Sequence, residues 1–247
     1  MARVARIAPP GAPHHVTQRG NGRQRIFDEP GDCALYRDLL AERCAANGVE
    51  CWAYCLMPNH VHLILAPATQ AGLSRAVGEA HRRYTGFFNA RARVTGHLFQ
   101  GRFASAAMDE EHFVAALRHL AFDPVRARLA ASPADWPHSS VAAHLSGRDD
   151  ALVRVAPALQ RVPRFADLLE PSLEEERLAA RFETASANGR PMGSPAFLEL
   201  VERALGRSLT PGKRGPKPKA PGREEKETEG QNIAIRILSP QSPGNPP

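Results

Sequence analysis

Cysteine is scarce in this chain of 247 residues, and the few cysteines show no spacing that would join them. They form no Cys-x-x-Cys pair and fall within one part of the chain: Cys33, Cys44, Cys51 and Cys55. A disulfide framework and a structural zinc site both need regular cysteine spacing. The pattern therefore speaks against both, and we expect buried free thiols in a reducing cytosol.

Long hydrophobic runs are also lacking. No apolar stretch approaches the roughly 20 residues that a membrane-spanning helix needs. Residues 1–13 contain no apolar core of the kind found in a secretory signal. We therefore expect a cytoplasmic protein with no membrane partner.

Lysine is absent before Lys213, so arginine supplies the positive charge of most of the chain. The formal net charge is +6 and the pI is about 9.5, which favours anionic partners. Arginine suits phosphate because its planar fork of N–H donors matches phosphate oxygens. A high genomic GC content would enrich arginine and alanine in the same way, and composition alone leaves both explanations open.

The most informative pattern that is present is His60-Val61-His62, which follows a Pro-Asn turn and opens an apolar, β-branched run. Such a run is typical of a strand, in which alternate side chains share one face. His60 and His62 therefore point the same way and make half of a divalent-metal site. The alternative is a pair of half-exposed histidines without a metal.

Hydrophobic periodicity predicts elements in the order β-α-β-β-α-β-α. We expect strands at 14–18, 49–57 and 60–66, helices at 32–46, 72–93 and 109–122, and a loop at 97–103 that leads into a strand. Pro124 should end the last helix or start the next turn. This order predicts a ferredoxin-like α+β fold, with an antiparallel sheet and helices on one face.

Composition divides the chain into three predicted parts. Residues 1–147 form the main domain, and residues 148–209 form a small helical accessory region. Residues 210–247 are rich in proline, glycine and charge, and we expect them to form a disordered tail.

Several ordered motifs resemble one family, the REP-associated tyrosine transposases of the HUH class of single-strand DNA transposases. The matching segments are 54–63 (YCLMPNHVHL), 97–103 (HLFQGRF) and 123–129 (DPVRARL), with 11–21 (GAPHHVTQRGN) before them and Trp136 and Ser139-Ser140 after them. The resemblance covers about residues 5–145. A further segment, about 189–207, resembles an accessory helix-turn-helix found in some relatives.

The resemblance implies a transposase that binds single-stranded or hairpin DNA. It also implies that a metal held by His60 and His62 polarises the scissile phosphate, which a helix tyrosine attacks. Here His119 stands at the position of that tyrosine, and Asp123 stands where the family has asparagine. His119 and Asp123 are four residues apart and share a helix face. We expect Asp123 to complete a site for Mg²⁺ or Mn²⁺, although such ligands also accept Zn²⁺.

His119 itself is open to four interpretations: a further metal ligand, a nucleophile that forms a phosphohistidine, a decayed position, or a position bypassed by another tyrosine. The other tyrosines are Tyr36, Tyr54 and Tyr84, and all three have the pattern of core residues.

Several arginines near the motifs are candidates for contacts with the DNA backbone. They are Arg19, Arg23, Arg102, Arg126 and Arg128. The arginines of helix 72–93 fit a solvated surface better. Phe99 and Phe103 suit either base stacking or core packing. His14 and His15 could lie near the site, but a surface or sheet-edge position fits them better.

Three functions compete: an HUH-class transposase that cleaves and joins single-stranded DNA, a hairpin-binding protein without catalysis, and a metal-dependent hydrolase unrelated to DNA. The arginine-rich turn and the family motifs speak against the third. The loss of the tyrosine predicts an impaired enzyme. The protein would act as a monomer or homodimer.

Overall fold

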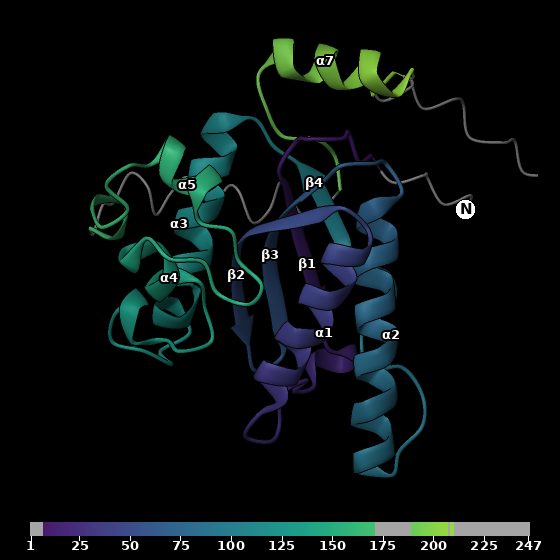
Figure 1. The fold of residues 1–247 in the computed structure, drawn as a ribbon. Coiled ribbons are helices and arrows are strands. Elements are labelled where there is room, and N and C mark those ends of the chain that lie inside the picture. The colour runs from purple at the N-terminus through teal and green to yellow at the C-terminus, as the bar shows by residue number, and fades with distance from the viewer. Residues whose placement is uncertain (1–6, 171–188, 207, 210–247) are drawn as a thin grey trace, which may run out of the picture. The chain divides into compact units, whose positions relative to one another are not determined.

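A four-stranded antiparallel sheet organises the computed structural model, which describes residues 7–170, 189–206 and 208–209 (Figure 1). The strands are β1 (His14–Arg19), β2 (Val49–Met57), β3 (His60–Pro67) and β4 (Ala104–Ala107), in the spatial order β2-β3-β1-β4. Each neighbouring pair runs antiparallel. β3 and β1 are therefore the central strands, and β2 and β4 are the edges.

Strands β2 and β3 form a hairpin whose turn is Pro58-Asn59. The turn puts His60 opposite Met57 on β2 and opposite Arg19 on β1. β2 carries an irregularity between Cys51 and Ala53, where the register against β3 shifts. The hairpin therefore fixes His60 at the end of a central strand.

Two helices, α1 (Asp32–Ala46) and α2 (Gly72–Ala92), cover one face of the sheet. They bury Val61, Leu63 and Leu65 of β3 in one apolar cluster. Helix α1 begins after Gly31, whose φ of 96° lies in the left-handed region that glycine tolerates. Figure 1 shows α1 and α2 side by side.

Helix α3 (Glu110–Arg126) lies over the opposite face of the sheet. Asp109 caps its N-terminus by accepting a hydrogen bond from the His112 backbone N–H at 3.1 Å. Ile64 and Ala66 pack into a second apolar cluster with residues of α3. α3 therefore faces the side of β3 that carries His60 and His62.

The predicted α+β class, with an antiparallel sheet and helices, is confirmed. The expectation placed the helices on one face, whereas α1 and α2 occupy one face and α3 the other. The cause is that both faces of β3 are apolar, so each needs a cover. The expectation that Pro124 ends the last helix or starts the next turn is also corrected: α3 continues to Arg126 with Pro124 in its final turn.

Further helices follow α3 in the described residues. They are η2 (Pro133–Asp135), α4 (Val141–Ser146), α5 (Ala156–Arg161), η3 (Asp167–Leu169) and α7 (Pro195–Leu205). Another short helix, η1 (Asn21–Arg23), follows β1. The Arg154 N–H donates to the Cys51 carbonyl on β2 at 2.8 Å, and the Met192 N–H donates to the Ala107 carbonyl on β4 at 2.7 Å.

The predicted division at residues 147 and 209 stays a prediction. Part of the predicted accessory region (residues 171–188) lies outside the described residues. So does the predicted tail (residues 210–247). The cysteines are free thiols, as expected, and Cys44, Cys51 and Cys55 are buried. In the described part of the chain, no helix combines the length and apolar character needed to cross a membrane.

Candidate metal and DNA site

The side chains of His60, His62 and Asp123 converge between β3 and the last turn of α3. The Nε2 atom of His60 lies 3.0 Å from Oδ2 of Asp123, and Nε2 of His62 lies 3.6 Å from the same oxygen. One ligand atom from each residue lies within 4.8 Å of the other two. The structure thus brings together the three residues that the sequence predicted as ligands.

The orientation of His60 is set by its neighbour in the turn. Nδ1 of His60 lies 2.7 Å from Oδ1 of Asn59, while the amide group of Asn59 donates to the Arg23 carbonyl at 3.4 Å. Because Oδ1 can only accept, Nδ1 of His60 carries a proton. A neutral His60 then presents a lone pair at Nε2 toward the Asp123 carboxylate. Two electron-rich atoms at 3.0 Å are stable only with a proton or a cation between them.

These separations fit a shared cation. Around an ion with bonds of about 2.1 Å, adjacent ligand atoms at right angles lie roughly 3.0 Å apart. The His60–Asp123 distance has this value, and the His62–Asp123 distance is only moderately wider. Two imidazole nitrogens and one carboxylate oxygen form a donor set used for divalent ions. The three residues therefore could bind a metal ion.

Their surroundings give His62 and Asp123 the protonation states that ligands need. Burial and the nearby His15 lower the pKa of His62 well below its ordinary value, so the imidazole is neutral at pH 7. Burial alone would raise the pKa of Asp123, but a proton shared with His60 in place of the cation, together with the charge of Arg126, outweighs burial. The net pKa is lowered, and Asp123 is ionised at pH 7.

His119 lies one helical turn before Asp123 and is buried, with 2% of its surface exposed. Its ring centroid is 5.0 Å from that of His62. Nη2 of Arg126 donates to Nδ1 of His119 at 3.2 Å and to its carbonyl at 2.7 Å. Burial and the Arg126 charge lower the pKa of His119 to about 4. His119 is therefore neutral, accepts at Nδ1 and carries its proton on Nε2.

All three tyrosines of the chain lie on the sheet face opposite the metal residues. Tyr36, Tyr54 and Tyr84 are buried in the cluster that α1 and α2 cover. Each hydroxyl has a partner: Nε2 of His81 for Tyr36, the Asp150 carboxylate for Tyr54 and the Ile26 carbonyl for Tyr84. Burial raises the pKa of each phenol. None of them reaches the candidate site, which removes the interpretation that another tyrosine replaces His119.

Four of the five predicted DNA-contact arginines carry no ion pair among the described residues: Arg19, Arg23, Arg102 and Arg128. Arg23, Arg102 and Arg128 are exposed and Arg19 is half-buried. The fifth, Arg126, differs because it holds His119 and Asp123.

Arg82 and Arg83 of α2 lie on the surface, as the sequence suggested, whereas Arg91 pairs with the buried Asp32. Arg82 pairs with Glu79 at 2.7 Å, and Arg83 pairs with Glu42 at 2.6 Å. Their positive charges are therefore already balanced on the surface.

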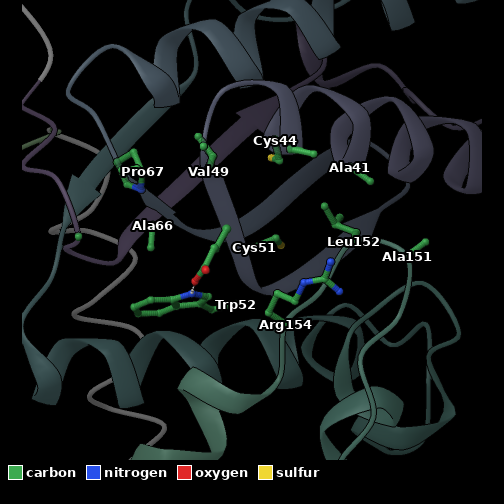
Figure 2. Close-up of a pocket in the computed structure, with 15 residues that line it drawn as sticks. Ala41, Cys44, Val49, Cys51, Trp52, Ala66, Pro67, Ala151, Leu152 and Arg154 are labelled. Carbon is green, nitrogen blue, oxygen red and sulfur yellow. Dashed lines mark hydrogen bonds between the residues drawn. The ribbon is translucent and has the colours of Figure 1, made fainter.

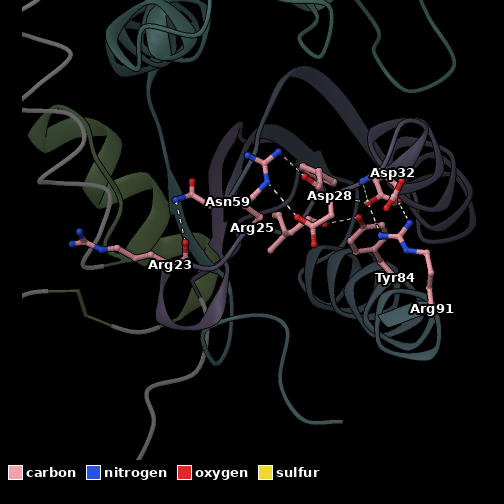
Figure 3. A network of polar contacts seen from close by, with 10 residues as sticks. Arg23, Arg25, Asp28, Asp32, Asn59, Tyr84 and Arg91 are labelled. Carbon is pink, nitrogen blue, oxygen red and sulfur yellow. Dashed lines mark hydrogen bonds and ion pairs between the residues drawn. The ribbon is translucent and has the colours of Figure 1, made fainter. Parts of the chain in front are cut away.

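A polar network supports the turn that carries Arg23 (Figure 3). Asp32 at the start of α1 accepts from the Asp28 N–H at 2.9 Å and from Nη2 of Arg91 at 2.8 Å. The Tyr84 hydroxyl donates to the Ile26 carbonyl at 2.6 Å. The network therefore ties the segment after Arg23 to α1 and α2.

Phe99 and Phe103 pack inside the protein, with 7% and 8% of their surfaces exposed. The Phe99 ring lies 4.5 Å from the ring of His81, nearly parallel to it. The structure therefore favours core packing over base stacking. These residues line one side of a pocket with Gln18, Arg82 and Arg102.

A second pocket lies beside the irregular part of β2 (Figure 2). Cys51, Trp52 and Arg154 line it, and the Trp52 N–H donates to the Glu50 carboxylate at 2.8 Å. Neither pocket contains a residue of the metal group. The candidate metal site is recognised by its ligands.

His15 lies next to the site, a position that the sequence analysis ranked second for it. The expected surface or sheet-edge position for His14 and His15 is wrong, because β1 is a central strand and both side chains are buried. Nε2 of His15 lies 2.9 Å from Nδ1 of His62. The local sequence contains no signal for this contact, which depends on the pairing of β1 with β3.

The site combines strand histidines and a helix carboxylate on an α+β fold. Residues 12–119 match the family described as IS200-like transposases. The matched segment covers less than half of the chain and runs from before β1 to His119 in α3. A search of curated proteins finds no match.

Two solved structures are similar in fold. One is a REP-associated tyrosine transposase bound to a REP hairpin, with 18% identity and a TM-score of 0.52, covering 63% of this chain and 94% of the other. The second is a putative transposase from Deinococcus radiodurans, with 18% identity and a TM-score of 0.34, covering 52% and 89%. The fold comparison depends on the first.

Proposed function

We propose that this protein is an HUH-class transposase-like protein that binds single-stranded or hairpin DNA and places one phosphodiester against a divalent ion. The ion would be Mg²⁺ or Mn²⁺, held by His60, His62 and Asp123. The observation that carries this proposal is the convergence of those three side chains in a chain that matches the IS200-like transposase family. The chain would act in the cytoplasm as a monomer or homodimer.

A bound divalent ion would supply charge stabilisation at the non-bridging oxygens of the phosphate. The chain's own contribution is orientation. Asn59 holds the His60 ring so that its Nε2 faces the site, and Asp123 adds the negative charge that attracts a cation. Arg19 is the last residue of β1 and Arg23 follows shortly after it. Arg19 pairs with His60, so it lies at the strand end that carries the site. These arginines would bind the DNA backbone next to the ion.

The position of the family nucleophile supports an impaired enzyme. A nucleophile needs a free lone pair that can reach phosphorus. The Nδ1 lone pair of His119 accepts from Arg126, and its Nε2 carries the proton. Neutral His119 therefore offers neither an open nucleophilic nitrogen nor an open ligand nitrogen. We propose that the wild-type protein forms no stable covalent DNA adduct and that any cleavage is slow.

The DNA partner is proposed from two sources. The relative of similar fold was solved with a REP hairpin. In this chain, unpaired arginines from the turn after β1, the 97–103 loop and the segment after α3 supply positive charge. Residues 1–147 would carry the DNA and metal sites, and residues 148–209 would be an accessory region.

The second candidate is a hairpin-binding protein without catalysis. The hydrogen bond from Arg126 to His119 favours it, because that bond blocks the nitrogen that a histidine nucleophile would use. In this case the metal site would anchor the DNA phosphate and the strand would stay intact.

Full-length protein and an end-labelled hairpin oligonucleotide separate the two candidates. Slow cleavage that requires Mn²⁺ and disappears in His60→Ala would support the first. Binding without cleavage in the same buffer would support the second. Equal affinity for hairpin, single strand and random duplex would contradict both.

A further inference from the structure

His15 is a buried histidine that the metal group does not contain. It lies on β1 opposite Ile64 of β3, so its side chain shares the sheet face of Ile64 and His62 beneath α3. Only 1% of its surface is exposed. Its position is set by a central strand.

His15 contacts His62 through one specific pair of atoms. Nε2 of His15 lies 2.9 Å from Nδ1 of His62, and the two ring planes differ by 7°. Two neutral imidazoles at this distance share one proton, so one nitrogen donates and the other accepts.

The direction of this hydrogen bond decides whether His62 can bind an ion. If His62 donates from Nδ1, its Nε2 lone pair is free toward Asp123, 3.6 Å away. If His15 donates instead, neutral His62 must carry its proton on Nε2 and cannot be a ligand there. His60 already shows the first arrangement, with Asn59 as the acceptor of its Nδ1 proton.

We propose that His15 is a positioning residue: its Nε2 accepts the Nδ1 proton of His62 and so holds His62 in the form whose Nε2 binds the divalent ion. His15 thus has the same role for His62 that Asn59 has for His60. The inference rests on the proposed metal site and adds to it a residue of β1.

Removing a residue that hydrogen-bonds the other ring nitrogen of a metal-bound histidine typically lowers metal affinity by roughly 10–100-fold. Two substitutions separate positioning from simple packing. His15→Leu replaces the ring with an apolar side chain of similar volume and so removes the acceptor. His15→Gln can place its amide oxygen near the position of Nε2 and keep the acceptor.

The test is Mn²⁺ affinity of the full-length protein, measured by calorimetry beside the melting temperature without metal. His15→Leu should weaken Mn²⁺ binding at least about tenfold. The Mn²⁺ affinity of His15→Gln should stay within a factor of about three of the wild-type value, because the acceptor is retained. A purely structural role predicts that both lose affinity in step with their melting temperatures. That result, or wild-type affinity in His15→Leu, would overturn the proposal.

A second measurement needs no metal. Nitrogen-15 chemical shifts of the histidines in the metal-free wild-type protein should show His62 protonated on Nδ1 and His15 with an unprotonated Nε2. The opposite tautomer of His62 would refute the inference even if His15→Leu fails to fold. If the wild type shows the expected tautomers but binds no Mn²⁺, the proposed metal function fails and the positioning of His62 stands.

Discussion

The salt dependence of DNA binding follows from the arginines that the structure leaves unpaired. If Arg19, Arg23, Arg102 and Arg128 each neutralise one phosphate, the slope of log affinity against log salt is about −2.8 to −3.6. Between 50 and 200 mM salt, affinity for a hairpin with a single-stranded flank should therefore fall roughly 50–150-fold. Fluorescence anisotropy with a labelled hairpin measures this directly.

Substitutions make the prediction specific. Changing any one of the four arginines to glutamine should weaken binding and reduce the slope by about 0.7–0.9. The matched control is the pair Arg82→Gln and Arg83→Gln, because Glu79 and Glu42 already balance these charges. A wild-type slope near zero would refute the reasoning. So would an equal effect of the control pair.

Other predictions concern the ligands and the turn. Asp123→Ala should weaken Mn²⁺ binding by more than the roughly 10–100-fold expected for loss of a residue that only holds a ligand, because it removes a charged ligand. Calorimetry measures the affinity. The control is Glu111→Ala, an exposed position on the same helix, which should bind Mn²⁺ as the wild type does. Asp32→Asn should destabilise the protein by about 1–3 kcal/mol at pH 7, since a buried acceptor loses its charge. Burial alone would raise the pKa of Asp32, but hydrogen bonds, including the one from Arg91, bring that pKa below its ordinary value. The ionised carboxylate therefore contributes fully to stability above about pH 4, and this contribution is lost as the pH falls through the folded pKa. In thermal melts from pH 7 to pH 3, the difference in melting temperature between Asp32→Asn and the wild type should shrink. The exposed control Asp38→Asn should show no difference. A difference that stays constant with pH would contradict a stabilising role for the Asp32 charge.

The local parts of the site could be predicted from the sequence. The two-residue period of a strand placed His60 and His62 on one face, and the helical period placed His119 above Asp123. The predicted helix at 32–46 matches α1, and the helix at 72–93 matches α2 within one residue. These features depend on neighbours along the chain, where periodicity is informative.

The remaining parts depend on contacts between distant segments. Whether β1 is central or at an edge is decided by strand order, so the contact of His15 with His62 could not be predicted. The unbroken apolar run of β3 did contain a signal that both sheet faces are covered. The Arg126 hydrogen bond to His119 spans seven residues at a helix end, and no pattern of spacing predicts it.

We infer that this chain keeps the metal residues of a transposase site and lacks its nucleophile. His119→Tyr tests it most directly, because it puts a phenol on the same helix face, beside His62. Wild-type and variant proteins are incubated with a labelled hairpin and Mn²⁺ and run on a denaturing gel. We predict no covalent band for the wild type and a metal-dependent 5′-DNA adduct for His119→Tyr that His60→Ala removes. A robust adduct in the wild type would contradict the account, and no adduct in either protein would leave hairpin binding as the function.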